Sequence, residues 1–391
     1  MKMFRCFALQ LILVPAVTGA ATYYVSPSGA DNNAGTLAAP FQTLMRAAQA
    51  AGPGDTVIVR DGTYGHVNAV TDGDTADTNA SPVVFTRSGT AQAFITFRAE
   101  HKWAAVLDCQ MICDSYFDLS NASYIAIQDF TITNSYREGI HSNGAAHDII
   151  IRGNQIEYIG NRPTSTTYGL DGLYTGPNCH DFTIDGNVFH DIGRTNVNWL
   201  DHGLYLRGSN FTIVNNIFYN LVRGWAIQLA DGLTNVMIAD NTFAFPNPNR
   251  DGQIMLWNTQ SGVTIRNNIF YSPLNIAITR YQSSVSACAI DHNLVFGTST
   301  VISDATGCIV SNNLMNTDPK FANTVSPPYD FHLLQGSPAA AAGVSLPGVD
   351  VDFDGLPRPA ASASIGALQY VTADWHKRLL GHKRPTPRHQ T

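Results

Sequence analysis

The sequence predicts an all-β protein, folded as one single-stranded right-handed parallel β-helix with an N-terminal helical cap. Three observations predict it: a short motif that recurs along the chain, strand-like alternation with no amphipathic helix between the copies, and a composition low in charge. Of the 391 residues 14% are charged and 44% hydrophobic, which is unlike a disordered chain or a coiled coil. The net charge of -7 gives no electrostatic footprint for nucleic acid, so no nucleic-acid partner is expected.

The recurring motif is an apolar alternation that leads to an Asn and then to a large apolar residue. Its copies centre on Asn154, Asn187, Asn216, Asn241, Asn268, Asn293 and Asn313, at intervals of 33, 29, 25, 27, 25 and 20 residues. An earlier copy, IAIQDFTITN, has Phe130 at the Asn position. One coil cannot bury its apolar face alone, so the coils must stack. Stacking predicts an internal ladder in which each Asn amide bonds the coils above and below.

A second alternating run accompanies each copy, over residues 139–144, 172–177, 203–208, 226–231, 253–258 and 277–282. In the second and third runs Leu173 and Leu204 point inward, so Tyr174 and Tyr205 point outward. Aligning the coils gives one outward column of His141, Tyr174, Tyr205, Gln228, Met255 and Thr279. The next outward column holds Asn143, Gly176, Arg207, Ala230, Trp257 and Tyr281.

The two ends of the chain have compositions of their own. Residues 1–21 have a basic start, an apolar stretch too short to span a bilayer and a small-residue exit, which is typical of a signal peptide. We therefore expect a secreted or periplasmic protein with no membrane partner after signal removal. Residues 373–391 form a basic tail that we expect to be flexible. No heptad or swapped element suggests an oligomer, so a monomer is expected.

The β-helix domain is predicted over residues 22–372. Its cap, residues 22–64, contains a helix from Phe41 to Ala51 that ends at Pro53-Gly54. This cap resembles the N-terminal segment of secreted β-helix carbohydrate enzymes, notably family 9 pectate lyases. Residues 318–372 are similar to the C-terminal segment of bacterial exported β-helix proteins, and we expect them to close the domain. The resemblance implies a β-helix that acts on polysaccharides.

The outward face of the repeated strands is rich in rings, carboxylates, His and Arg. Sugars stack on aromatic rings while polar groups fix their orientation, and a face that crosses several coils suits a polysaccharide substrate. The residues expected to bind it are His141, Tyr174, Asp201, Arg223, Trp225, Gln228, Trp257, Arg280 and Tyr281.

The segments YGLDG and LDHG lie one coil apart and contain Tyr168, Asp171 and His202. They are similar to the Tyr-Gly-x-Asp and His-Gly segments of β-helix mannuronan C5-epimerases, and the resemblance places these three residues at catalytic positions. Two differences exist: Gly172-Leu173 replace the Pro-His of the epimerases, and Asp201 replaces their Arg. Asp171 and His202 also precede Gly at strand starts, so the alternative is that they bond turn amides.

The implied chemistry is removal of the C5 proton of a uronic acid, which requires that the carboxylate charge be neutralised. His202 is the candidate base, and Tyr168, Tyr174 or Tyr205 is the candidate acid. Arg207, Arg223 or Arg280 could bind the carboxylate. Asp171 and Asp201 could orient His202 or hold Ca²⁺, the one cofactor considered, and no other metal site is expected.

Lysine and cysteine limit the chemistry further. Family 9 pectate lyases use a Lys base, but Lys102, Lys320, Lys377 and Lys383 all lie outside the repeated strands. The resemblance therefore does not carry that mechanism. The acidic loop TDGDTAD with Asp72, Asp74 and Asp77 lacks the spacing of an EF-hand. Five Cys remain after signal removal, and we expect buried thiols with at most one bridge.

Four functions remain open on these residues. The first is a polysaccharide lyase that cleaves a uronic-acid polysaccharide by β-elimination. The second is a C5-epimerase of the same substrate class. The third is an inverting glycoside hydrolase that uses Asp171 and Asp201 as its acid and base. The fourth is a non-catalytic glycan-binding protein, since the fold does not fix the function.

Overall fold

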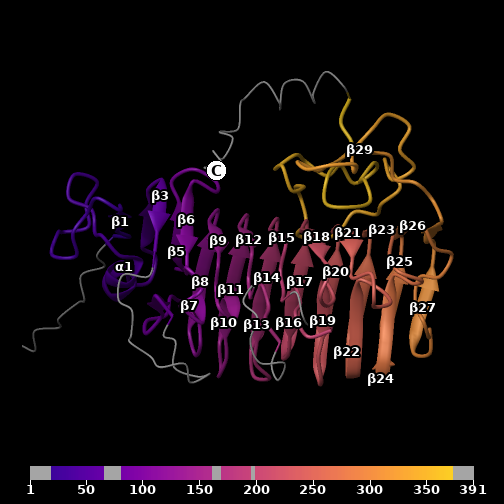
Figure 1. Cartoon of the computed structure of the whole chain (residues 1–391), viewed down its shortest axis with the longest axis horizontal. Helices are drawn as coiled ribbons and strands as arrows, with labels where there is room; N and C mark the ends of the chain where they lie inside the picture. The colour runs from indigo at the N-terminus through magenta and orange to yellow at the C-terminus, as the bar shows by residue number, and fades with distance from the viewer. Residues whose placement is uncertain (1–18, 66–80, 161–168, 195–198, 373–391) are drawn as a thin grey trace, which may run out of the picture.

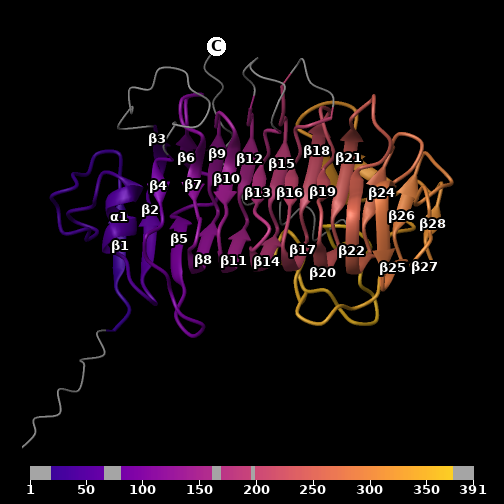
Figure 2. The ribbon, with the colours of Figure 1, turned by 90° about the horizontal axis from the view of Figure 1, so that it is seen from below.

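The computed structural model describes residues 19–65, 81–160, 169–194 and 199–372. Residues 1–18 of the predicted signal peptide, the acidic loop of Asp72, Tyr168 and the predicted basic tail lie outside these ranges. Parallel strands stack along one axis as a solenoid, with the helix α1 (Leu44–Ala50) at its start (Figures 1 and 2). The prediction of a parallel β-helix is confirmed. Among the described residues, no helix is long and apolar enough to cross a lipid bilayer.

Each full coil contributes one strand to each of three rows, which we call rows 1, 2 and 3. Row 1 consists of β4 (Val83–Val84), β7 (Ser115–Asp118), β10 (Glu138–Ser142), β13 (Leu173–Thr175), β16 (Leu204–Leu206), β19 (Ile227–Leu229) and the first parts of β22 (Ile254–Arg266) and β24 (Ile278–Ser286). Row 2 consists of β1 (Thr22–Val25), β2 (Thr56–Val59), β5 (Ile95–Ala99), β8 (Ser123–Gln128), β11 (His147–Arg152), β14 (His180–Asp185), β17 (Ser209–Val214), β20 (Leu233–Ala239), the later parts of β22 and β24, β25 (Cys288–Asp291) and β27 (Cys308–Ser311).

Row 3 consists of β3 (Gly62–Tyr64), β6 (Ala105–Asp108), β9 (Thr131–Thr133), β12 (Gln155–Glu157), β15 (Val188–His190), β18 (Ile217–Leu221), β21 (Thr242–Pro246), β23 (Ile269–Tyr271), β26 (Leu294–Phe296) and β28 (Leu314–Met315). Inside the three rows, apolar side chains of one kind lie above each other. Phe189, Phe218, Phe243 and Phe270 form a continuous ring stack with centroids 5.0 Å apart.

The predicted Asn ladder is present at the corner between rows 2 and 3. Oδ1 of Asn241 accepts from the backbone N–H of Asn216 at 2.8 Å, and its side-chain amide donates to the carbonyl of Ile213 at 2.9 Å. The same pattern joins the other copies of the motif, and the Asn residues from Asn154 to Asn293 are fully buried. The ladder begins where Phe130 donates its N–H to Asn154, as its place in the repeat predicts.

The C-terminal segment, residues 318–372, lies along the outside of row 3 and contains the hairpin of β29 (Phe321–Asn323) and β30 (Asp330–Leu333) (Figure 1). Its apolar residues pack on outward residues of row 3 such as Ile217 and Ile269. The segment thus covers the side of the solenoid, because row 3 has an apolar outer face there. On the last coil Val310 and Ile309 stay 37% and 74% exposed.

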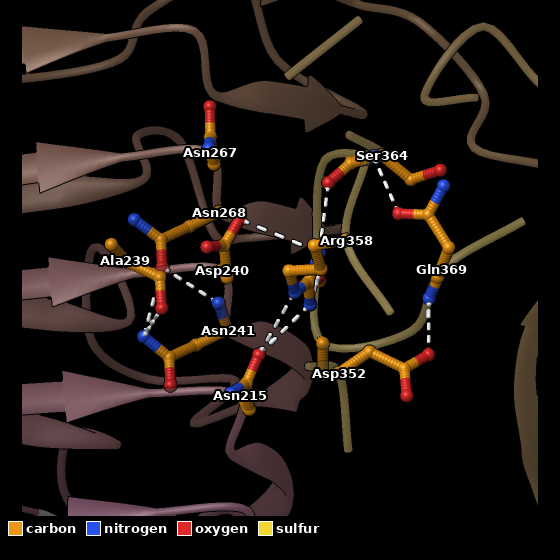
Figure 3. Close-up of polar contacts among 12 residues, drawn as sticks. Asn215, Ala239, Asp240, Asn241, Asn267, Asn268, Asp352, Arg358, Ser364 and Gln369 are labelled. Atoms are coloured by element: carbon orange, nitrogen blue, oxygen red, sulfur yellow. Dashed lines mark hydrogen bonds and ion pairs between the residues drawn. The ribbon is translucent and has the colours of Figure 1, made fainter. Parts of the chain in front are cut away.

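Arg358 anchors this segment to the solenoid (Figure 3). Its guanidinium donates to Oδ1 of Asn215 at 2.9 Å and to the carbonyl of Gly366 at 2.8 Å, and it lies 3.6 Å from Asp240. The side-chain amide of Asn267 donates to the carbonyl of Val344 and accepts the backbone N–H of the same residue. These polar contacts follow the corner next to the Asn ladder.

Two disulfides are present, Cys109–Cys113 and Cys288–Cys308, and Cys179 is a buried free thiol. The expectation of at most one bridge was therefore wrong. The second bridge joins neighbouring rungs, because the register pairs Cys288 with Cys308. The motif copies around Asn293 and Asn313 already indicated that stacking.

Candidate functional site

The outward column of row 1 has the register that the sequence predicts. His141 pairs with Tyr174, Tyr174 with Tyr205, and the column continues through Gln228, Met255 and Thr279. Its accessible part ends at Tyr205, since Gln228 and Met255 are 9% and 7% exposed. The second predicted column is interrupted at Ala230, which is fully buried beyond the end of β19.

The accessible rings form one continuous stack. The centroids of His141 and Tyr174 lie 5.2 Å apart with planes at 9°, and those of Tyr174 and Tyr205 lie 5.7 Å apart with planes at 14°. All three residues are half-buried. Because parallel strands repeat at about 4.8 Å, the coil spacing itself brings these rings into contact.

A carboxylate lies behind the His at the start of this stack. Nδ1 of His141 is 3.7 Å from Oε2 of Glu138, and Nε of Arg137 is 3.7 Å from Oε1 of the same buried carboxylate. Burial lowers the pKa of His141, but the Glu138 carboxylate and then Asp118 outweigh it, so the pKa is raised above 6.5. The sequence did not connect Glu138, the first residue of β10, to His141. Residues three apart on a strand point to opposite faces, so the alternation gave no signal for this contact.

Tyr205 lies at the other end of the accessible stack. Burial raises its pKa above the ordinary value of 10.0, the buried Asp171 raises it further, and the Arg207 guanidinium acts in the opposite direction. Arg207 is half-buried and stands two residues after Tyr205 on the same face. The site therefore holds an imidazole, two phenols and a guanidinium within three rungs.

Asp171 and His202 do not belong to this accessible face, because they are 2% and 1% exposed. Oδ1 of Asp171 accepts the backbone N–H of His202 at 3.0 Å, and Nδ1 of His202 accepts the backbone N–H of Trp225 at 3.0 Å. Burial lowers the pKa of His202 to about 3, and burial followed by the nearby Glu138 carboxylate raises that of Asp171 well above 3.8. Both side chains bond turn amides of the next coil, which is the alternative that their position before Gly left open.

Asp201 is also inside the protein, with no exposed surface. It forms an ion pair with Arg194 at 2.6 Å, and it accepts the backbone N–H groups of Arg194 and Leu170. Sequence reasoning missed Arg194, which is itself 1% exposed. Asp171 and Asp201 are thus buried hydrogen-bonded groups, which is not the arrangement that a hydrolytic acid–base pair requires.

The remaining predicted binding residues are divided between surface and interior. Trp225 was expected to be exposed, yet it is 7% exposed and its indole N–H donates to the carbonyl of Asp251 at 2.9 Å. The side chain of Arg280 is held by Ser283 and by the carbonyls of Asp304 and Thr306, which occupies its donors. Arg223 and Trp257 are half-buried, while Tyr281 is 56% exposed and pairs with Trp257 in the register.

Asp171 and Asp201, the two residues expected to orient His202 or to hold Ca²⁺, are already bonded within the protein. The carboxylates of Asp171 and Asp201 are committed to backbone amides and to Arg194. Within the described part of the chain, the one group of three metal-ligating side chains is Asp61, Glu100 and His101, at the surface near row 3. Glu100 there is paired with Arg60.

Two family models match the chain. One, described as Pel9A-like, right handed beta helix region, matches residues 23–168. The other, described as right handed beta helix region, matches residues 115–270 and 171–320, which together exceed half of the chain.

Two curated proteins are similar over part of their length. Pectate lyase PEL9 of Emericella nidulans is 34% identical over 123 residues, which are 30% of this chain and 27% of that protein. The uncharacterized protein YwoF of Bacillus subtilis is 30% identical over 148 residues, which are 35% of this chain and 28% of that protein. The matched part is thus less than a third of either relative.

Solved structures are similar over most of the chain. The crystal structure of pectate lyase Pel9A has a TM-score of 0.58 and 13% identity, and covers 91% of this chain and 98% of its own. A glycoside hydrolase has a TM-score of 0.51 and 9% identity, and covers 75% of this chain and 96% of its own. Identities this low establish the fold alone. The family models, the relatives and the stacked rungs agree that the chain belongs to the right-handed β-helix family.

Proposed function

We propose that this protein is a secreted polysaccharide lyase that cleaves a uronic-acid-containing polysaccharide by β-elimination. The observation that carries the proposal is the accessible stack of His141, Tyr174 and Tyr205, with Glu138 behind the imidazole and Arg207 beside the last phenol. The partial similarity to pectate lyase PEL9 supports the same class of reaction.

The stack supplies a surface for a sugar chain. The faces of these rings lie against each other, so a sugar chain meets their edges, where the imidazole nitrogens and the phenol groups form hydrogen bonds that fix its orientation. The three rings lie on consecutive rungs, so a polymer that runs along the solenoid axis contacts all of them. Arg207 lies two rungs from His141 and pairs with the carboxylate of a uronate unit further along the bound chain, which fixes the register of that chain.

The elimination then needs one base and one acid. His141 in its neutral form takes the C5 proton, and the electron pair of that C–H bond forms the C4–C5 double bond. The C4–O4 bond breaks, and Tyr174, whose ring lies against His141, gives its phenolic proton to the leaving oxygen. Proton exchange with water restores both groups. Glu138 positions His141 from behind and never contacts the sugar.

His202 is not the base in this proposal, because it is buried and already hydrogen-bonded. Nδ1 of His202 accepts the backbone N–H of Trp225. A pKa of about 3 makes the imidazole a very weak base. Together with Asp171 it fixes the corner from which β13 and β16 start. Its contribution to the reaction is to hold the ring stack in register.

The proposal is tested by incubation with polygalacturonate, alginate and glycosaminoglycans. A lyase produces an unsaturated sugar that absorbs in the ultraviolet, together with new reducing ends. We expect this absorbance with wild-type protein and its loss in His141→Ala. The matched control is His180→Ala, since His180 is a comparable exposed imidazole on row 2. Reducing ends without absorbance would indicate hydrolysis, and a changed uronate composition without cleavage would indicate epimerisation. Either result would reject the lyase.

A further inference from the structure

An exposed Trp lies on a turn that leads into row 1. Trp199 is 49% exposed, and the guanidinium carbon of Arg250 lies 5.1 Å from its ring centroid. Trp199 precedes β16 and Arg250 precedes β22, so the pair spans the rung of β19 between them. These are the rungs on which Gln228 and Met255 are buried and the accessible stack has ended.

A bonded Asp lies close to each of these two residues in the sequence. Two residues after Trp199, the buried Asp201 pairs with the guanidinium of Arg194 and accepts its backbone N–H. The turn of Arg250 is held where Asp251 accepts from the indole of Trp225 and from the amide of Asn275. Trp199 and Arg250 therefore each stand within two residues of a bonded Asp, Asp201 and Asp251 respectively.

An exposed indole beside a guanidinium can bind a sugar that carries a carboxylate. The indole face binds the C–H face of a pyranose, and half of its surface stays open although Arg250 covers part of it. The guanidinium pairs with a carboxylate. A neutral sugar would use the first group only, whereas a hexuronate uses both.

We infer that Trp199 and Arg250 form a separate subsite for a hexuronate unit of the substrate chain, two to four rungs beyond His141. This inference rests on the proposed function for the direction of the chain but not for the binding itself. At about 4.8 Å per rung, the subsite lies roughly 10–19 Å from His141. Long chains reach it and short oligomers bound at the ring stack do not.

The kinetic test compares chain lengths in Trp199→Ala and Arg250→Gln. We expect KM for polygalacturonate or alginate to rise about tenfold in each variant, as the loss of one stacking or ion-pair contact predicts. We expect kcat on the polymer and all rates on a disaccharide to stay unchanged. Arg152→Gln is the control, because Arg152 is an exposed Arg on row 2 that pairs with Asp185. An unchanged KM for the polymer, or an equal loss on short oligomers, would overturn the subsite.

A binding test separates the subsite from the lyase. In native gels that contain the same polyuronates, wild-type protein and Arg152→Gln should migrate more slowly than in a plain gel, and Trp199→Ala should be retarded less. If no polymer is cleaved but this difference remains, the subsite stands and the proposed lyase function falls. Equal retardation of wild type and Trp199→Ala, or no retardation of either, would overturn the subsite.

Discussion

A single Asn in the ladder satisfies the polar groups of three coils. Asn241 accepts from the backbone and side chain of Asn216 and donates to Ile213 and Asn268. These partners are buried, so water cannot replace the lost bonds. One residue type at each repeat thus explains both the motif in the sequence and the fixed stacking of the rungs.

We predict that Asn241→Ala lowers the free energy of unfolding by about 3 kcal/mol, since it leaves several buried donors and acceptors unpaired. Equilibrium denaturation measures this change. Asn178→Ala is the control, because Asn178 is exposed in a turn and should change the same quantity by about 0.5 kcal/mol or less. Equal effects of the two substitutions would mean that the ladder contributes little.

The pH dependence of turnover identifies the role of His141. Its pKa is raised above 6.5, so a base at this position is inactive while protonated. We predict that kcat/KM rises with pH through that pKa and that the rise moves to lower pH in Glu138→Gln, because the carboxylate that holds the proton is removed. A rate that falls over the same range would make His141 an acid. If Glu138→Gln left the pH profile unchanged, Glu138 would not be the group that sets the pKa of the catalytic base.

The alternation along the strands correctly predicted that His141, Tyr174 and Tyr205 point outward in one column. It could do so because successive side chains of a strand point to opposite faces. The same rule gave no information on Asp171, His202 and Trp225, which stand two residues before the first residue of their strands, at a corner. There the side chain turns toward a backbone N–H or carbonyl of the next coil, and a bonded corner residue has the same sequence context as a catalytic one. Arg194 was missed because its partner Asp201 lies seven residues away across a loop.

At the scale of elements, one His between two Asp side chains joins two parts of the C-terminal segment. His332 on β30 lies between Asp330, at 2.5 Å, and Asp354, at 2.7 Å. Asp354 belongs to the stretch that begins with Asp352, so this His ties the hairpin to the part of the segment that lies against Trp103. The sequence could not predict that junction, because no repeat or period connects the two stretches.

We predict that stability decreases as pH rises from about 6.5 to 9. Burial lowers the pKa of His332, but the two carboxylates outweigh it and raise the pKa to about 9. A folded-state pKa above the unfolded value stabilises the protein below pH 6.5, and this stabilisation is lost as pH rises through 9. Melting temperatures of wild type and His332→Gln should converge over this range. Since His141 and His190 also have raised pKa values, the difference between the two proteins is the quantity to follow.

For the whole molecule, the solenoid alone would be a chain of nearest-neighbour contacts. Each rung touches only the rung before and after it, so such folds can unfold from one end. The C-terminal segment changes this, because it contacts coils from Trp103 to Asn267 at the same time. Arg358 joins two of these coils through Asn215 and Asp240 (Figure 3). The segment therefore connects distant rungs into one unfolding unit.

This connection predicts that wild-type protein unfolds in a single transition and that Arg358→Met divides it into two. Without the guanidinium, the buried carboxylate of Asp240 loses its nearby positive charge, and docking of the segment weakens. Hydrogen exchange under increasing denaturant should then show rungs after Asn268 opening before rungs around Asn154. Arg152→Met is the control, because Arg152 pairs with Asp185 on the next rung and adds no long-range contact. A single transition in both variants would mean that the apolar packing of the segment, without Arg358, is sufficient to couple the coils.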